Sequence, residues 1–307
     1  MWLRLLAATM LALGLAGPCW ADCASFNTSP INLTYDPLGG AATLGVFRGF
    51  SLSVTRGDSV SGGVTGVTAQ FMDQGQTGAI FRLDGGPTYD IIDADNAEVV
   101  VHQSDAPLLS NHSFYADFSS RADQGRTVAM KQINGLAIYV PPGQDVAAGV
   151  YAATLDVQFE CAVGQNTGNV RLQTGVLPIT ITVPSVLSVN LAGGGQKGTI
   201  DFGQFEDATK SANIQVRSTG PFVLRISAEH AGKMLLQGAS GGAGREIPYT
   251  LTFNGAAAPL DADIAFGRTG VGGLSMPLAA TVGDVSGERA GVYKDTLTVV
   301  FTPKATL

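Results

Sequence analysis

The stretch A-G-V-Y-K-D-T-L-T-V-V-F, residues 290–301, has a near copy 142 positions earlier, A-G-V-Y-A-A-T-L-D-V-Q-F at residues 148–159. Eight of the twelve positions are identical. In both copies a Gly turn precedes residues that alternate between apolar and polar, the pattern of a half-buried β-strand. A repeat spaced by about one domain length is more typical of a duplicated sandwich module than of a solenoid. The repeat therefore predicts two related β domains.

Composition agrees with this expectation. Charged residues make up 14% of the chain, and 40 of its 307 residues are Gly. Short alternating runs separated by Gly, Asp, Asn and Ser turns, with few helix signals, predict an all-β protein of two immunoglobulin-like β-sandwich domains. The net charge is −7 and no cluster of Lys and Arg stands out, which argues against a nucleic-acid or anionic-membrane partner.

The first 21 residues have the composition of a secretory signal peptide. Arg4 precedes an apolar run at residues 5–15, and the small residue Ala21 provides a cleavage site. Removal of residues 1–21 would leave an N-terminal domain at residues 22–183 and a C-terminal domain at residues 184–307. We expect the mature chain to be exported and to work outside the reducing cytosol.

The cysteines support an oxidising compartment. Cys19 leaves with the signal peptide, so Cys23 and Cys161 remain as an even pair. We predict a disulfide between them that joins the first and last strands of the N-terminal domain. Closing a loop of this length is worth roughly 4 to 5 kcal/mol in the chain-entropy model. The C-terminal domain has no cysteine and depends on packing, or on a partner.

Six motifs follow one another in the C-terminal domain: I-D-F-G (200–203), Q-V-R-S (215–218), F-V-L-R-I-S (222–227), I-P-Y-T-L-T-F-N-G (247–255), T-V-G-D (281–284) and A-G-V-Y-K-D-T-L-T-V (290–299). In sequence and order they resemble the spore coat protein U family, whose members are subunits of archaic, Csu-type chaperone–usher pili. The resemblance covers roughly the last 120 residues, and the N-terminal domain shares only its terminal strand and the preceding P-P-G-Q.

The resemblance implies an incomplete C-terminal sandwich that lacks one strand. A periplasmic pilus chaperone would fill the gap first, and the N-terminal strand of an adjacent pilin subunit would replace it at the outer-membrane usher. Backbone pairing would give affinity, and alternate side chains would fill pockets. Left empty, such an edge favours aggregation.

The predicted mature N-terminus places the chain within such a fibre. Only Asp22 precedes Cys23, whereas an ordinary pilin needs about ten residues to form a donated strand. The chain is therefore expected to be the tip adhesin at the cell surface, where hydrophobic loops of its N-terminal domain would contact an abiotic or host surface and support biofilm formation. The candidate contact residues are Leu38, Pro107, Leu108, Leu109 and Phe114.

Enzymatic interpretations have weaker support. Ser240 fits G-x-S-x-G at residues 238–242, but in a Gly-rich run without a strand-to-helix context, and His102, His112 and His230 lack ligand spacing. We therefore predict no catalytic residue, no metal and no cofactor. The alternatives are a secreted carbohydrate-binding protein, a structural coat or shaft subunit, and a secreted hydrolase that depends on Ser240. Trp2 and Trp20 both leave with the signal peptide, which weakens the carbohydrate-binding alternative.

Overall fold

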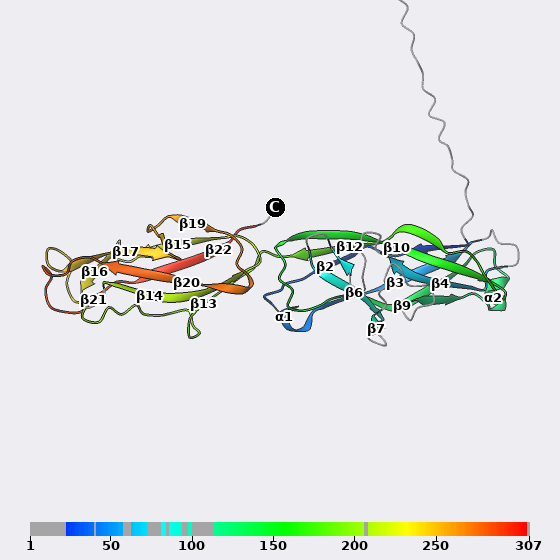
Figure 1. Cartoon of the computed structure of the whole chain (residues 1–307), viewed down its shortest axis with the longest axis horizontal. Coiled ribbons are helices and arrows are strands. Elements are labelled where there is room, and N and C mark those ends of the chain that lie inside the picture. Colours follow the sequence, from blue (N-terminus) through cyan, green and yellow to red (C-terminus); the bar gives the residue numbers. More distant parts are fainter. Residues whose placement is uncertain are drawn as a thin grey trace, which may run out of the picture.

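The computed structural model describes residues 23–39, 41–57, 63–72, 81–83, 86–93, 98–99, 113–205 and 208–305. The predicted signal peptide and the candidates Pro107, Leu108 and Leu109 lie outside these residues. Figure 1 shows two β-lobes arranged end to end along one axis. We refer to described residues 23–183 as the N-terminal lobe and to described residues 187–305 as the C-terminal lobe.

The N-terminal lobe consists of two layered sheets, as predicted for an all-β sandwich. One sheet has the order β1 (Ala24–Asn27), β3 (Val46–Arg56), β9 (Ala129–Val140), β6 (Thr88–Asp93) and β5 (Phe81–Arg82), with β7 (Glu98–Val99) paired to β6. The other has the order β2 (Ile31–Thr34), β12 (Arg171–Val183), β10 (Gly149–Val163), β4 (Gly66–Met72) and β8 (Phe114–Asp117), with β11 (Asn166–Thr167) paired to β10. The two described helices, α1 (Ala41–Leu44) and α2 (Arg121–Gln124), each have four residues.

In the N-terminal lobe, even the edge strands β1 and β2 contribute buried side chains to the core. Phe26 of β1 and Leu33 of β2 are both less than one-tenth exposed, although each belongs to an edge strand. The predicted disulfide between Cys23 and Cys161 is confirmed and spans 138 positions. The prediction that it joins the first and last strands is wrong, because Cys161 lies within β10 and the hairpin strand β12 follows it.

The C-terminal lobe also has two layers (Figure 1). The larger sheet has the order β13 (Leu187–Leu191), β14 (Thr209–Ser218), β20 (Gly270–Val282), β17 (Glu246–Phe253), β16 (Lys233–Leu236) and β21 (Tyr293–Lys294), with β18 (Ala256–Ala257) paired to β17. The smaller sheet has the order β19 (Asp263–Phe266), β15 (Phe222–Ala228) and β22 (Leu297–Pro303).

The two copies of the repeated sequence fold differently. The first lies in β10, which pairs with β12 on one side and β4 on the other. The second is split, because residues 293–294 form β21 in the larger sheet while residues from Leu297 onward form β22 in the smaller sheet. The chain crosses from one sheet to the other at Asp295 and Thr296.

Polar contacts connect the lobes at their junction. The backbone N–H of Ala148 donates to the carbonyl of the fully buried Thr219 over 2.8 Å. The Asp145 carboxylate accepts hydrogen bonds from the Arg268 guanidinium and, at 3.0 Å, from the backbone N–H of Val271. None of the helices in the described part of the chain has the length and apolar character needed to span a membrane.

Candidate functional site: an open sheet edge in the C-terminal lobe

Strand β22 has a paired neighbour on one side only. It pairs with β15 in a register that places Phe301 opposite Leu224 and Val299 opposite Ile226. Among the described strands nothing pairs with its other edge. Strand β13, at the edge of the larger sheet, lies close to β22 without pairing with it. We call these two facing edges the open edge.

The open edge is apolar and only partly covered. Six side chains that pack on the C-terminal core from these two strands are all partly exposed: Leu187, Val189 and Leu191 of β13, and Leu297, Val299 and Phe301 of β22. On the adjacent strand β15, the inward-facing Leu224 and Ile226 are fully buried. Leu297, Val299 and Phe301 of β22 face the same core as Leu224 and Ile226 of β15. Their greater exposure therefore arises because no described strand pairs with the far side of β22, and not because they point away from the core.

Covering this edge would stabilise the lobe. Full burial of a Val, Leu or Phe side chain is worth roughly 1.5 to 3 kcal/mol, and the part still to be gained here is smaller, because these six are already partly buried. A strand laid along the edge would also pair with backbone groups that have no strand partner in the described residues. The open edge can therefore bind an extended chain that carries an apolar side chain at every second position.

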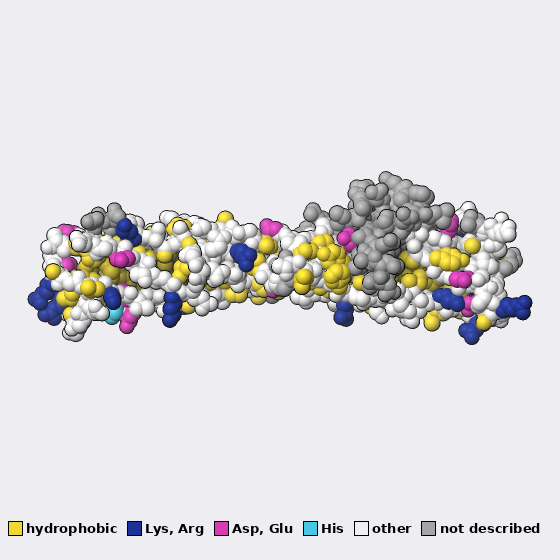
Figure 2. Space-filling view, turned by 90° about the horizontal axis from the view of Figure 1, so that it is seen from below, with side chains coloured by type: hydrophobic (Ala, Val, Ile, Leu, Met, Phe, Trp, Pro, Cys, Tyr) yellow, Lys and Arg dark blue, Asp and Glu magenta, His cyan; other side chains and the backbone are white. Residues whose placement is uncertain are grey.

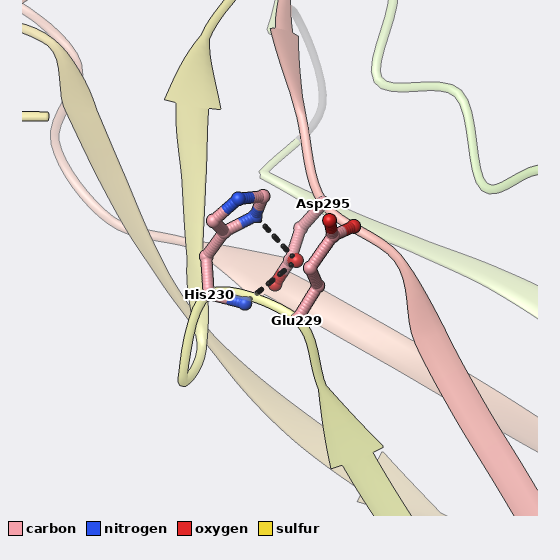
Figure 3. Close-up of side chains that lie close together, drawn as sticks. All are labelled: Glu229, His230 and Asp295. Atoms are coloured by element: carbon pink, nitrogen blue, oxygen red, sulfur yellow. Dashed lines mark hydrogen bonds and ion pairs between the residues drawn. The ribbon is translucent and has the colours of Figure 1, made fainter. Parts of the chain in front are cut away.

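Side-chain and backbone contacts hold β22 at both of its ends. Near its C-terminal end, the Ser185 hydroxyl donates to the carbonyl of Lys304 over 2.6 Å. Just before its N-terminal end, the side chains of Glu229, His230 and Asp295 meet (Figure 3). Glu229 and His230 follow β15, and Asp295 lies at the crossing between the two sheets.

The Asp295 carboxylate, which is 3% exposed, accepts four hydrogen bonds. Its Oδ1 accepts from His230 N at 3.1 Å, His230 Nδ1 at 2.9 Å and Thr296 N at 2.8 Å. Its Oδ2 accepts from the Tyr249 hydroxyl at 2.5 Å. Burial, together with this hydrogen bond, raises the pKa of Tyr249 well above its usual range, so the hydroxyl stays protonated and donates.

The cluster has the residue types of a metal site, since one ligand atom from each of Glu229, His230 and Asp295 lies within 4.8 Å of the others. However, the four donors already occupy both oxygens of Asp295, and a metal would have to displace the His230 hydrogen bond. We therefore interpret the cluster as a hydrogen-bonded clasp. The sequence did not reveal it, because His230 and Asp295 are 65 positions apart.

Two of the predicted surface-contact residues lie elsewhere than expected. Phe114 is 9% exposed in β8, where its ring packs against Phe26 and Phe71, so its prediction as a loop residue is wrong. Leu38 is half-buried in a turn held by Asp36 Oδ1, which accepts from Leu38 N at 2.9 Å. This turn follows Tyr35, whose N–H donates to Thr182 near the end of β12, so it lies beside the lobe junction rather than at the far end.

Exposed apolar side chains do occur on, or directly before, strands that run toward the far end of the N-terminal lobe. They are Tyr115, Val128, Met130, Val170 and Leu172. The Lys and Arg side chains on the face drawn in Figure 2 lie as separate spots, without a continuous basic patch among the described residues.

A polar pocket of about 430 Å³ lies where the chain leaves β1 for β2, beside β3. Its lining includes Asn27, Thr28, Ser29, Arg48, Phe50 and Gln132. Ser240, the predicted alternative nucleophile, is exposed in the loop between β16 and β17.

Comparison with known proteins identifies pilus tip adhesins among the structural neighbours. No family model and no curated protein matches the chain, so the resemblance to spore coat protein U stays a prediction. The chaperone–tip subunit complex CsuC–CsuE of archaic Csu pili from Acinetobacter baumannii matches with 15% identity and a TM-score of 0.41, covering 91% of this chain and 99% of that chain.

Two further adhesins match over similar lengths. The CupB6 tip adhesin from Pseudomonas aeruginosa has 14% identity and a TM-score of 0.42, with 91% of this chain and 94% of that chain covered. CfaE, the adhesive subunit of CFA/I fimbria of enterotoxigenic Escherichia coli, has 13% identity and a TM-score of 0.44, with 92% and 94% covered. At these identities the matches concern the fold alone.

Proposed function

We propose that this chain is the non-enzymatic tip adhesin subunit of an archaic chaperone–usher pilus. In this proposal the C-terminal domain, residues 184–307, is a pilin domain of the spore coat protein U type, and a strand donated by the adjacent subunit completes it. The N-terminal domain, residues 22–183, is the adhesin that contacts an abiotic or host surface and supports biofilm formation. The signal peptide directs export to the periplasm, and the pilus carries the chain to the cell surface.

The observation that carries this proposal is the difference between the two repeat copies. Strand β10 has β12 beside it from its own chain, whereas β22 has no described strand in that position. A donated strand would take beside β22 the place that β12 takes beside β10. It would pair along β22 and cover Leu297, Val299 and Phe301, which are now only partly buried.

The same edge explains the order of partners that we propose. An unpaired apolar edge is an aggregation hazard in a newly exported chain. A periplasmic chaperone that lends a strand would protect it until the outer-membrane usher exchanges that strand for one from a pilin subunit. Both partners would be recognised by backbone pairing and alternate apolar side chains.

In the N-terminal domain, we propose that surface contact occurs at the end farthest from the C-terminal lobe. The exposed Tyr115, Val128 and Met130 support this location, because a surface that binds by apolar contact needs apolar side chains in water before it binds. Pro107, Leu108 and Leu109 stay candidates. Leu38 is replaced as a candidate, because its turn lies at the junction.

A tethered strand tests the proposal. A nine-residue segment of alternating Val and Thr, joined behind residue 307 by a short Gly/Ser linker, should raise the melting temperature of the C-terminal lobe by roughly 5 to 10 °C. A matched segment with every Val replaced by Ser is the control. Hydrogen exchange should show new protection in β13 and β22 only with the Val segment, and equal effects of both segments would refute the open edge as a strand acceptor.

The polar pocket supports a second candidate, carbohydrate binding by the N-terminal domain. Arg48, Asn27 and Gln132 supply donors and acceptors of the kind that bind sugar hydroxyl or carboxylate groups. Binding to a glycan array that is lost with Arg48→Ala, and kept with Lys210→Ala in the other lobe, would favour it. Binding to hydrophobic surfaces that survives Arg48→Ala would favour the first candidate.

A further inference from the structure

The residue two positions before β22 differs between the two repeat copies. Asp295 of the second copy stands where the first copy has Ala153. The backbone of Ala153 is opposite Ile179 in the ladder between β10 and β12. Asp295 lies between β21 and β22 and belongs to no described ladder. At this position the acidic side chain thus occurs in the copy that lacks a second neighbouring strand among the described residues.

The Asp295 side chain connects segments that a neighbouring strand would otherwise hold. Its carboxylate binds the turn after β15 through His230 and binds β17 through Tyr249. The N–H of Glu229 also donates to the carbonyl of Thr296 over 2.9 Å. These bonds fix residues 295–296 immediately before the first rung of the sheet, which pairs Ala228 with Leu297.

We propose that Asp295, held by His230 and Tyr249, is the positioning residue of the open edge: it fixes the start and register of β22 before a partner strand arrives. This inference rests on the proposed function of the open edge. A strand that is already in register spares its partner the cost of ordering it, so binding is faster and tighter. The bond between Ser185 and Lys304 holds the opposite end, leaving the middle of β22 free to pair.

Hydrogen exchange of the free, full-length chain tests the positioning role without any partner. Asp295→Ala, which restores the residue of the first copy, should speed exchange of amides 297–303 by about tenfold, because a buried charged hydrogen-bond centre is lost. Tyr249→Phe should give a smaller increase in the same segment. Asp295→Asn, which keeps the size and part of the acceptor capacity, provides a milder variant in case Asp295→Ala does not fold.

Asp263→Ala is the matched control. Asp263 lies on β19, at the opposite edge of the same sheet, and forms an exposed ion pair with Arg225 at 3.6 Å. It should leave the exchange of β22 unchanged. An equal rise in exchange across all C-terminal strands, or no rise in β22 with Asp295→Ala, would overturn the positioning role.

Two further measurements distinguish a failure of the positioning role from a failure of the proposed strand acceptance. EDTA should leave the exchange of β22 in the wild-type chain unchanged, and a loss of protection would show instead that a metal holds the cluster. Adding the alternating Val/Thr peptide to wild type tests the proposed function itself: no binding refutes strand acceptance and leaves the exchange result intact. If the peptide binds wild type, Asp295→Ala should lower its association rate, and an unchanged rate would contradict pre-positioning.

Discussion

The two copies of the repeated strand share most of their residues and differ in what lies beside them. Leu155 and Phe159 in β10 are at most 1% exposed, whereas their equivalents Leu297 and Phe301 in β22 are only partly buried. Strand β10 lies between two neighbours, and β22 has one among the described strands. Similar sequences thus occur in a closed core and at an open edge. The burial of their equivalent side chains differs because the neighbouring strands differ.

The backbone groups of the edge strands also have different partners in the two lobes. In the N-terminal lobe the amide of Gln173 replaces a strand for Phe26, accepting from its N–H and donating to its carbonyl, both at 2.8 Å. The C-terminal lobe instead holds β22 near its ends and leaves the length between available. An edge whose backbone groups are bonded by side chains of the same lobe is typical of a domain that is complete by itself. An edge held only at its ends leaves its backbone groups available to pair with a strand from a partner.

The largest expected effect concerns the disulfide, which only the N-terminal lobe contains. Replacing Cys23 and Cys161 by Ser should destabilise that lobe by roughly 4 kcal/mol, because the loop closed by 138 positions becomes free in the unfolded chain. Denaturant unfolding followed by hydrogen exchange of separate segments measures each lobe. The C-terminal lobe should be unaffected, and a matching loss there would show that the two lobes unfold as one unit.

The next effect compares equivalent leucines of the repeat. Leu155→Ala should cost roughly 3 kcal/mol, as expected for a fully buried side chain, while Leu297→Ala should cost about 1 kcal/mol in the free chain. Tethering the alternating Val/Thr strand should raise the cost at Leu297 toward that at Leu155, because the cavity would then be enclosed. Denaturant unfolding of wild type, the two variants, and the tethered chain with and without Leu297→Ala measures this, and equal costs at both positions without the strand would contradict an open edge.

Local patterns predicted the strands of both repeat copies, because period-two alternation identifies which residues face a core. They could not predict that β22 lacks a neighbour, since pairing depends on residues far away in the chain. Phe114 looked like a loop residue beside Ser and Asn, yet β8 alternates Phe114 and Ala116 inward. The turn around Leu38 was predictable from its Asp and Gly residues, but its place at the junction follows from the pairing of β2 with β12.

The hydrogen-bonded cluster around Asp295 could not be predicted from local sequence patterns either. His230, Tyr249 and Asp295 come from three separate segments, so spacing along the chain gave no signal. The available signal was the repeat itself, where Lys294 and Asp295 stand in place of Ala152 and Ala153 between the identical Val-Tyr and Thr-Leu pairs. Two charged residues at positions that are alanine in the other copy indicate a change in their surroundings.

The smallest effect is acid sensitivity, which we compare through one carboxylate in each lobe that is paired with a Lys. A hydrogen bond from Lys131 holds the pKa of Asp123 below its usual range in the N-terminal lobe, and Lys233 does the same for Glu246 in the C-terminal lobe. A carboxyl whose pKa is lowered by folding stabilises the protein above its unfolded pKa of about 4, and this contribution is lost as pH falls through the folded value.

Asp123→Asn should therefore flatten the acid dependence of unfolding in the N-terminal lobe below about pH 4, and Glu246→Gln should flatten that of the C-terminal lobe. Urea unfolding between about pH 2 and 7, read separately for each lobe, measures both. The effects should be small, because both ion pairs are partly solvated. If Glu246→Gln also changed the acid dependence of unfolding of the N-terminal lobe, the junction would couple the stabilities of the two lobes. The closed core and the open edge would then not be independent.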